Sequence, residues 1–463
     1  MQAAQNELLT RIGPATACGD LMRRYWQPVA LLDEFDPQLD PRMATRPLKA
    51  VRLLGQNLVL FRDGAGTFGL LDRDCPHRGA DLAFARHEGD GIRCPFHGWK
   101  FDVTGRCLQT PAEPVGSTLC QRVQQRSYPV RVVAGVVFAF LGAEDSTLPE
   151  LPAFDAFTAP GTHSFAFKGL WHCNWLQAFE VGIDPVHPSF LHRYLEDEAP
   201  DADKAYGRQF RAASAGEVDG ERWPMTRVMR EFCSPEIHFD DVAPGLTRLT
   251  TLRLMNEQLT HVRVTHAAFP HTFVIPLSET VTITQMHVPV DDEHTCWYSF
   301  FTSFAGPLDK DTMRRQRLAH MQLPDYVPKN GRHNDWNFNA HEQHTRTYLG
   351  MGEEDINLHD QWAVESMGAI QDRTREHLGT SDKVIMAHRR TLLKAIETVR
   401  AGGTPPMVLN VADAQALQGP DTIDCIAPAQ GWQLHWQQAA AAKRAGAAWL
   451  AAPVKAAGTA TSP

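Results

Sequence analysis

The chain has 463 residues, 43% of them hydrophobic, which is enough to bury a large core and predicts two or three globular domains. A net charge of -9 without a block of like charges argues against a nucleic-acid partner. The nine cysteines are scattered and odd in number, which fits a reducing compartment rather than a disulfide framework. There is no apolar run long enough to span a membrane and no signal-like start, so we expect a cytoplasmic protein.

Much of the first third of the chain has the sequence pattern of an all-β domain. Residues 1–45 combine an amphipathic start with Pro and Asp residues that interrupt regular structure, and we expect an N-terminal segment that packs on a later domain. From residue 46 to residue 148, short apolar runs are bounded by Gly, Asn and Asp, which is typical of strands and hairpins. The Pro-rich stretch at 149–160 predicts a linker into a second domain.

Residues 149–450 predict a second domain of mixed α+β type. A helix should end at Pro185, and helical periodicity returns over residues 360–400. Four runs between these helices are typical of antiparallel strands, at residues 246–255, 259–269, 279–290 and 296–304. The Ala-rich residues 451–463 predict a disordered tail. The fold class expected for the whole chain is α+β.

The most specific motif lies in CPHRGADLAFARHEGDGIRCPFHGW, where Cys-x-His is followed by Cys-x-x-His. Zinc fingers pair Cys with Cys and His with His, whereas each short motif here supplies one thiolate and one imidazole. Two loops of a β framework would then offer Cys75 and Cys94 to one iron and His77 and His97 to the other, which is the Rieske arrangement of a [2Fe-2S] cluster. A zinc site or four unrelated residues are the alternatives.

A second candidate metal site lies in NWLQAFEVGIDPVHPSFLH. Asp184, His187 and His192 follow a predicted helix, and Pro185 and Pro188 interrupt it. Histidines five apart would diverge on a regular helix, so irregular backbone is needed to turn both toward one point. A two-His, one-carboxylate site on Fe(II) leaves positions open for O₂. Without the first motif, two ordinary histidines at an exposed helix end would be the simpler interpretation.

With both motifs, the chain resembles the Rieske non-haem iron oxygenases, specifically the α subunits of the phthalate dioxygenase-like branch. The resemblance extends from LMRRYWQPV through HVPVDDEHTCWYSF to SDKVIMAHRRTLL. It implies a Rieske domain followed by a catalytic domain with an antiparallel sheet flanked by helices, of the helix-grip type. It implies one [2Fe-2S] cluster on the four loop residues, and one mononuclear Fe(II) per subunit with His187 and His192 as ligands.

The third iron ligand implied by the resemblance is Asp360, five residues before Glu365 in the family's Glu-Ser-Met-Gly run. His359, Glu365 and Asp355 are competing candidates. The carboxylate of Asp184, one turn before His187, is expected to accept a hydrogen bond from the second nitrogen of that ligand. In the family it also bridges to a cluster histidine of the neighbouring subunit, so the implied electron path runs from His97 of one chain to Asp184 of the next. Such a path requires a homotrimer or stacked trimers.

The implied activity is that of the terminal oxygenase of a multicomponent system. It uses O₂ and electrons from a separate NAD(P)H-dependent flavin and iron–sulfur reductase to hydroxylate an aromatic substrate, expected to be a phthalate- or phenoxybenzoate-like carboxylate. Aryl-ether O-demethylation or monooxygenation is the alternative. The chain has no dinucleotide fingerprint and no plant-type ferredoxin cysteine spacing, so the reductase must be another polypeptide.

Four residues are candidates for contacting substrate. Arg253 and Arg263 lie on predicted strands and could bind a carboxylate, or could be structurally paired. Some relatives have an amide three residues before the bridging aspartate, where this chain has Val181, and Asn174 or Gln177 could substitute for it. Residues 194–235 resemble an insertion that could cover the pocket.

Two rivals belong to other functional classes. A Rieske electron carrier would need only the first 150 or so residues and has no use for the second histidine motif. A binding protein with a degenerate site would be expected to have lost a ligand, and none of the implied ligands is missing.

Overall fold

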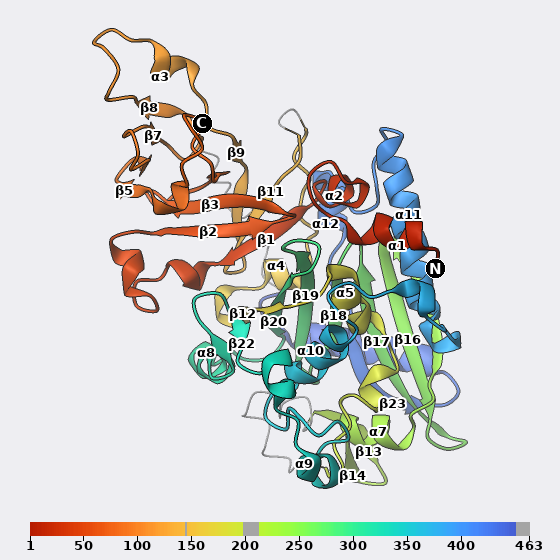
Figure 1. The fold of residues 1–463 in the computed structure, drawn as a ribbon. Helices are drawn as coiled ribbons and strands as arrows, with labels where there is room; N and C mark the ends of the chain where they lie inside the picture. The colour runs from red at the N-terminus through yellow and green to blue at the C-terminus, as the bar shows by residue number, and fades with distance from the viewer. Residues whose placement is uncertain (144–145, 198–212, 451–463) are drawn as a thin grey trace.

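The computed structural model describes residues 1–143, 146–197 and 213–450. Figure 1 shows a smaller part, which contains β2 to β9 and the short helix α3, set beside a larger part built on one long sheet. The tail at 451–463 lies outside the described residues, as do residues 198–212 of the expected insertion. The division of the chain at residues 45 and 148 stays a prediction.

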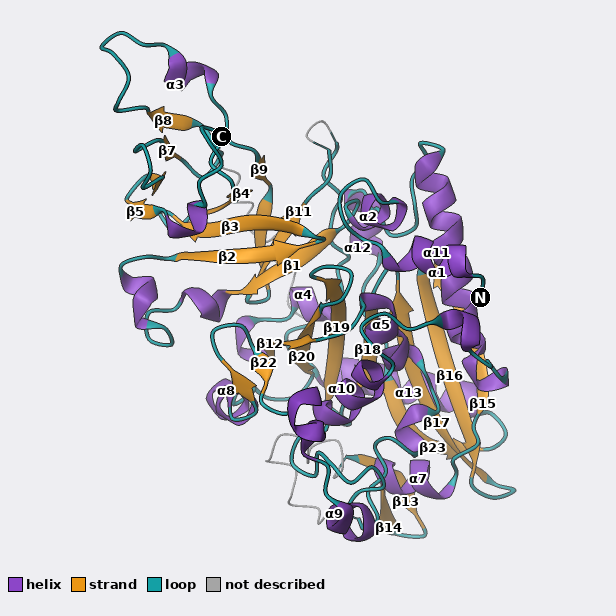
Figure 2. Cartoon of the chain, viewed as in Figure 1, coloured by secondary structure: helices purple, strands orange, loops and turns teal. Residues whose placement is uncertain are grey.

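Three small antiparallel sheets form the first part, and Figure 2 shows their strands in orange. The first has the order β1 (Trp26–Leu31), β11 (Val136–Phe140) and β10 (Val130–Val133). The second has the order β2 (Leu48–Leu53), β3 (Gln56–Arg62), β4 (Phe68–Asp72) and β9 (Ser127–Tyr128). The third has the order β5 (Arg86–Glu88), β6 (Gly91–Arg93), β7 (Lys100–Phe101) and β8 (Cys107–Gln109).

The N-terminal segment contacts both parts. Its helices α1 (Ala3–Thr10) and α2 (Ala17–Met22) contact α11 (Lys383–Arg400) of the larger part. Its strand β1 hydrogen-bonds to β11 of the smaller part. The segment therefore ties the two parts together as well as packing on the second.

The large sheet is antiparallel throughout. Its strand order is β12 (Ser164–Trp171), β20 (Thr295–Ser303), β19 (Val281–Pro289), β18 (Thr272–Pro276), β17 (Leu259–Ala268), β16 (Leu246–Leu254) and β15 (Glu236–Ala243). β23 (Ile423–Pro428) pairs with residues 259–264 of β17, on the same edge that β18 uses at residues 266–268. The four strands predicted from the sequence are β16, β17, β19 and β20.

The two faces of β17 have different partners because successive side chains in a strand point to opposite faces. Val262 and Val264 are buried in a cluster with Trp436 of α13 (Trp432–Gly446). Arg263 and Thr265, which alternate with them, line an internal cavity on the other face. The sheet thus has a helix-covered side and a cavity side.

Helix α5 (Trp175–Ile183) covers the cavity side beside α10 (Asn357–Ser366), as Figure 1 shows. The Asn174 side chain caps α5 by accepting a hydrogen bond from the Leu176 amide, and the helix ends before Pro185 as predicted. A Cβ atom at Gly182 would lie 2.0 Å from the Phe273 ring, so glycine lets α5 approach β18 closely.

The remaining elements are short. The helices are α3 (Leu119–Arg122), α4 (Asp155–Thr158), α7 (Met225–Glu231), α8 (Lys310–Leu318), α9 (Ala340–Thr345) and α12 (Val411–Ala416). The strand pairs are β13 (Ser214–Val218) with β14 (Glu221–Pro224) and β21 (Met321–Gln322) with β22 (Val327–Pro328). Among the described residues, no helix has both the length and the apolar character needed to cross a membrane.

Candidate metal centres and active-site cavity

The two Cys-His loops have the same backbone geometry. In the first, the Cys75 amide donates to the Ala80 carbonyl at 2.8 Å, and the Gly79 amide donates to the Cys75 carbonyl at 2.8 Å. The second loop repeats both bonds, from Cys94 to Trp99 at 2.8 Å and from Gly98 to Cys94 at 3.0 Å. Both glycines have positive φ, +75° and +74°, which favours glycine at these turns.

These matched loops bring the four predicted cluster residues together. Cys75 and Cys94 are each 2% exposed, whereas His77 and His97 are only partly buried. The rings of His77 and His97 are 4.5 Å apart, and His77 stacks on Trp99 at 4.3 Å. Nδ1 of His97 is buried without a hydrogen-bond partner among the described residues. Two inner thiols and two outer imidazoles, one with an unused nitrogen, fit a Rieske cluster.

A second set of ligand atoms converges behind the end of α5. Nε2 of His192 lies 3.3 Å from Oδ1 of Asp360, and Nε2 of His187 lies 3.7 Å from the same oxygen. This oxygen is buried and has no hydrogen-bond partner among the described residues. Burial and the neighbouring His192 lower the pKa of His187, so its imidazole is neutral at pH 7, as a metal ligand must be. Two imidazoles and a carboxylate fit a mononuclear Fe(II).

The competitors for the third position do not converge there. Glu365 is occupied with structural hydrogen bonds, from the His172 amide at 3.0 Å and from Nε1 of Trp336 at 2.9 Å. The ligand atoms of His187, His192 and Asp360 all lie within 4.8 Å of one another, and this group includes neither Asp355 nor His359.

A mainly apolar cavity of about 130 Å³ adjoins this group. Its apolar wall includes Trp171, Phe273 and Phe301, and its polar wall includes Arg263 and Arg317. Such a space, with a few convergent polar groups, is typical of a small-molecule site. A separate outer hollow of about 880 Å³ lies on the other side of Asp184 and His187, which line both spaces.

Comparison with known proteins gives two family matches. Residues 26–129 match the Rieske [2Fe-2S] domain, and residues 139–418 match the LigXa C-terminal domain like family. The phthalate 4,5-dioxygenase oxygenase subunit of Pseudomonas putida is 31% identical over 415 residues, covering 86% of this chain and 87% of that protein. The chain is a Rieske non-haem iron oxygenase, of the phthalate dioxygenase-like branch.

Other relatives of the oxygenase differ in what their names say they act on. The tert-butanol monooxygenase / tert-amyl alcohol desaturase oxygenase subunit of Aquincola tertiaricarbonis is 32% identical, over 87% of this chain and 78% of that protein. The 5,5'-dehydrodivanillate O-demethylase oxygenase subunit of Sphingobium is 30% identical, over 88% of this chain and 84% of that protein. The terminal oxygenase of carbazole 1,9a-dioxygenase from Nocardioides aromaticivorans shares the fold, with a TM-score of 0.53 and 17% sequence identity. The match covers 86% of this chain and 98% of that one.

The oxygenase is therefore the O₂-using component of a multicomponent system that needs a reductase. Its cofactors are a Rieske [2Fe-2S] cluster and a mononuclear non-haem iron. The predicted α+β class, with a Rieske domain and an antiparallel catalytic sheet with helices, is confirmed.

One predicted hydrogen bond of the oxygenase is wrong. Nδ1 of His187 meets the main-chain carbonyl of Asp184, at 2.7 Å, and not its carboxylate. The carboxylate instead accepts from the amides of Val186 and His187, at 2.8 and 3.3 Å. The physical reason is the tight turn after α5, in which an aspartate side chain caps the amides two and three residues ahead.

The two arginine candidates have different surroundings. Arg253 does not line the cavity; it is 1% exposed and donates to the Pro185 carbonyl at 3.2 Å, which supports the turn that carries His187. Burial lowers its pKa to about 10. Arg263 does line the cavity, but it forms a buried ion pair with Asp424 of β23. The prediction that these two arginines bind a carboxylate is therefore not supported for Arg253 and weakened for Arg263.

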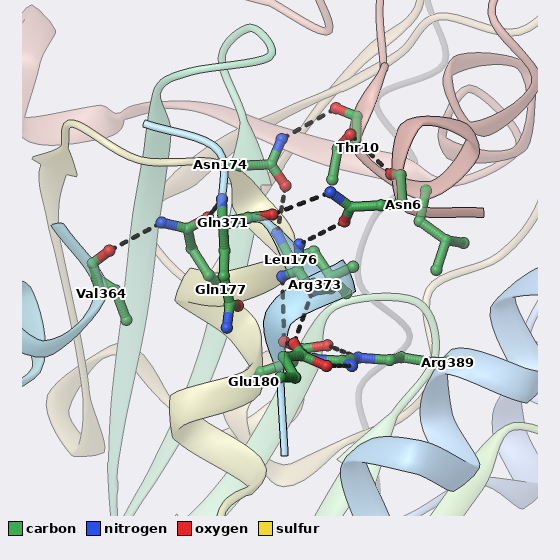
Figure 3. A network of polar contacts seen from close by, with 12 residues as sticks. Asn6, Thr10, Asn174, Leu176, Gln177, Glu180, Val364, Gln371, Arg373 and Arg389 are labelled. Atoms are coloured by element: carbon green, nitrogen blue, oxygen red, sulfur yellow. Dashed lines mark hydrogen bonds and ion pairs between the residues drawn. The ribbon is translucent and has the colours of Figure 1, made fainter. Parts of the chain in front are cut away.

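The two amide candidates have structural roles in the network of Figure 3. Nδ2 of Asn174 donates to the carbonyls of Thr10 and Asp292, at 2.9 and 2.7 Å, and the residue is fully buried away from the cavity. Nε2 of Gln177 donates to the carbonyls of Val364 and Gly368, both at 2.8 Å. Neither amide lines the cavity beside Asp360. Both amides donate to main-chain carbonyls from distant parts of the sequence and so hold α5 in place.

Sequence reasoning missed two residues at the site. Arg317 of α8 lines the cavity, and its guanidinium lies over Phe167, Trp297 and Phe301 at 5.3, 5.6 and 4.6 Å. Nothing in the local pattern of α8 distinguishes it from its charged neighbours. His359 was weighed only as an iron ligand, yet its Nδ1 lies 3.1 Å from Nδ1 of His192.

Proposed function

We propose that His187, His192 and Asp360 hold the mononuclear iron, and that Cys75, His77, Cys94 and His97 hold the Rieske cluster. The first assignment is supported by the convergence of two Nε2 atoms on one buried carboxylate oxygen, which has no hydrogen-bond partner in the described part of the chain. The repeated loop geometry supports the second. When bound, the iron supplies the site at which O₂ is activated by electrons from the cluster.

We further propose that the substrate is an aromatic carboxylate, oxidised in the cavity beside Asp360. The apolar wall suits a ring, and the cavity also contains the buried cations Arg263 and Arg317. Both arginines are candidates for contacting the carboxylate, and Arg263 would do so while paired with Asp424. Aromatic acids are named for the phthalate relative and for the 3-chlorobenzoate-3,4-dioxygenase oxygenase subunit of Comamonas testosteroni, which is 31% identical.

The proposal includes a trimer in which Asp184 connects the cluster of one chain to the iron of the next. Figure 1 shows the β5–β8 sheet beside the cluster loops lying well away from α5 and α10 of the same chain. Asp184 and His187 form the wall between the cavity and the outer hollow. Half-exposed apolar side chains line that hollow, and such a surface suits a protein partner. These side chains are Phe190, Phe338, Tyr348, Met367 and Leu378.

We place this activity in the cytoplasm.

The test combines the oxygenase with a Rieske-system reductase, NADH and a panel of phthalates, phenoxybenzoates, methoxybenzoates and neutral aromatics. We expect O₂ uptake matched by hydroxylated product with one or more of the acids. Turnover of the neutral aromatics alone would contradict the carboxylate proposal.

A further inference from the structure

We propose that His359 is a positioning residue for the iron ligand His192, acting as the acceptor for the proton on its Nδ1. This inference rests on the proposed ligand set. The two Nδ1 atoms are 3.1 Å apart, within hydrogen-bond range, and the rings lie at 24° to each other.

The direction of this hydrogen bond follows from the metal side of His192. Its Nε2 faces Asp360, so Nε2 must give its lone pair to the iron. A neutral imidazole that binds a metal through Nε2 carries its proton on Nδ1. Two facing ring nitrogens need one proton between them, so His192 donates and His359 accepts. His359 must then carry its own proton on Nε2.

The two histidine ligands are thus held by different acceptors. Nδ1 of His187 meets a main-chain carbonyl, that of Asp184, which no side-chain substitution can remove. Nδ1 of His192 meets a side chain. The His192 ligand is therefore the one whose orientation depends on the identity of another side chain.

Helix α10 contacts His192 on both ring nitrogens with two consecutive residues. Asp360 lies beside Nε2 and His359 lies beside Nδ1, so one helix fixes a carboxylate ligand and the acceptor that orients a histidine ligand. His359 itself is fully buried and held from behind, since a Cβ at Gly352 would lie 2.6 Å from its Cδ2. With its ring confined in this way, His359 is rigid enough to set the plane of His192.

The experiment compares two substitutions at this position in the full chain. His359→Gln can present a carbonyl acceptor, whereas His359→Phe keeps a ring and removes the acceptor. After iron is stripped under anaerobic conditions with the cluster retained, Fe(II) is titrated back and its dissociation constant is measured. We expect His359→Phe to weaken Fe(II) binding about 10- to 100-fold. His359→Gln should remain within about threefold of the wild type, a rescue that loss of packing alone would not give.

A matched control is His266→Leu, which removes another buried histidine from the face of β17 that is turned away from the cavity. It should leave Fe(II) binding unchanged. The rhombicity of the EPR signal of the Fe(II)–nitric oxide adduct gives a second measurement, and it should change in His359→Phe and be restored in His359→Gln. If His359→Phe does not fold, His359→Leu takes its place in both assays.

Equal Fe(II) affinity and an unchanged signal in the variant that lacks an acceptor would overturn the proposal. So would equal losses in His359→Gln and His359→Phe. The variant His192→Ala separates this inference from the ligand assignment. Undiminished Fe(II) binding by His192→Ala would overturn the ligand set and with it the role of His359, whereas loss in His192→Ala with none in His359→Phe would overturn the role of His359 alone.

Discussion

Nδ1 of His187 donates a hydrogen bond to the main-chain carbonyl of Asp184, 2.7 Å away, while the Asp184 carboxylate accepts from two backbone amides of the same turn. The orientation of this iron ligand therefore depends on the shape of the turn more than on the charge of the aspartate. The negative charge of Asp184 is not needed to orient His187, and it lies at the wall between the cavity and the outer hollow.

Asp184→Asn should keep the iron and lose turnover. An asparagine side chain can still accept from the amides of Val186 and His187, and the carbonyl that meets His187 is unchanged. We expect Fe(II) affinity within about threefold of the wild type and product formation lower by about 10- to 100-fold. Metal analysis, stopped-flow reduction of the cluster and product assay check this. Turnover at the wild-type rate would contradict a role for this carboxylate in the proposed electron path.

Arg317→Gln should weaken the binding of acidic substrates selectively. The cavity would lose a buried cation, so KM for an aromatic acid should rise about tenfold, or about 1.4 kcal/mol, with little change for its neutral amide. The matched control is Arg314→Gln on the same helix, because Arg314 pairs with Asp33 and Asp311 and does not line the cavity. Equal KM changes in the two variants, or for acid and amide alike, would argue that Arg317 has a packing role.

Glu180→Gln should lower the stability of the catalytic part and leave the iron ligands in place. Glu180 accepts from Arg373 at 3.1 Å and from Arg389 at 2.5 and 2.8 Å, and all three side chains are buried (Figure 3). Removing one partner of a buried ion pair leaves an uncompensated charge, at a cost of about 3–5 kcal/mol. Calorimetry should show Tm lowered by several degrees. Asp40→Asn, which breaks the exposed pair with Arg42, should cost under about 1 kcal/mol.

The same network predicts a pH dependence of stability. Burial alone would raise the pKa of Glu180, but Arg373 and Arg389 outweigh it and lower the pKa below its ordinary value of 4.5. The stabilisation is then complete above pH 4.5 and is lost as the pH falls toward the lower pKa of the folded state. The difference in Tm between wild type and Glu180→Gln should be constant from pH 7 to pH 5 and should narrow below 4.5. A constant difference throughout would contradict this assignment.

Local spacing was enough to find the cluster loops and the histidine pair. Cys75, His77, Cys94 and His97 lie in two short turns, and each turn forms its own backbone bonds, so their grouping is encoded within a few residues. The end of α5 at a proline and the strands β16, β17, β19 and β20 also follow from local pattern. Asp360 was reached only through the resemblance, because nothing near it in the sequence points to residues some 170 positions earlier.

The features that sequence reasoning missed all depend on long-range contacts. Asp424 neutralises Arg263 because the six-residue strand β23 adds to β17 from far along the chain. Arg317 lines the cavity because of how α8 packs, and its own helix gives no sign of it. Asn174 and Gln177 have the chemistry of substrate ligands, but their amides are satisfied by carbonyls that only the fold brings near.

A single turnover without reductase tests whether His187, His192 and Asp360 hold the iron at which O₂ reacts. The oxygenase is reduced chemically with Fe(II) in place, freed of reductant, and mixed with ¹⁸O₂ and the aromatic acid that the substrate panel identifies. The wild type should oxidise its cluster and release product containing ¹⁸O, whereas Asp360→Ala, with its cluster reduced to the same extent, should release none. Labelled product from Asp360→Ala at the wild-type level, or none from the iron-loaded wild type, would contradict this assignment of the iron ligands and the oxygenase activity proposed for the site.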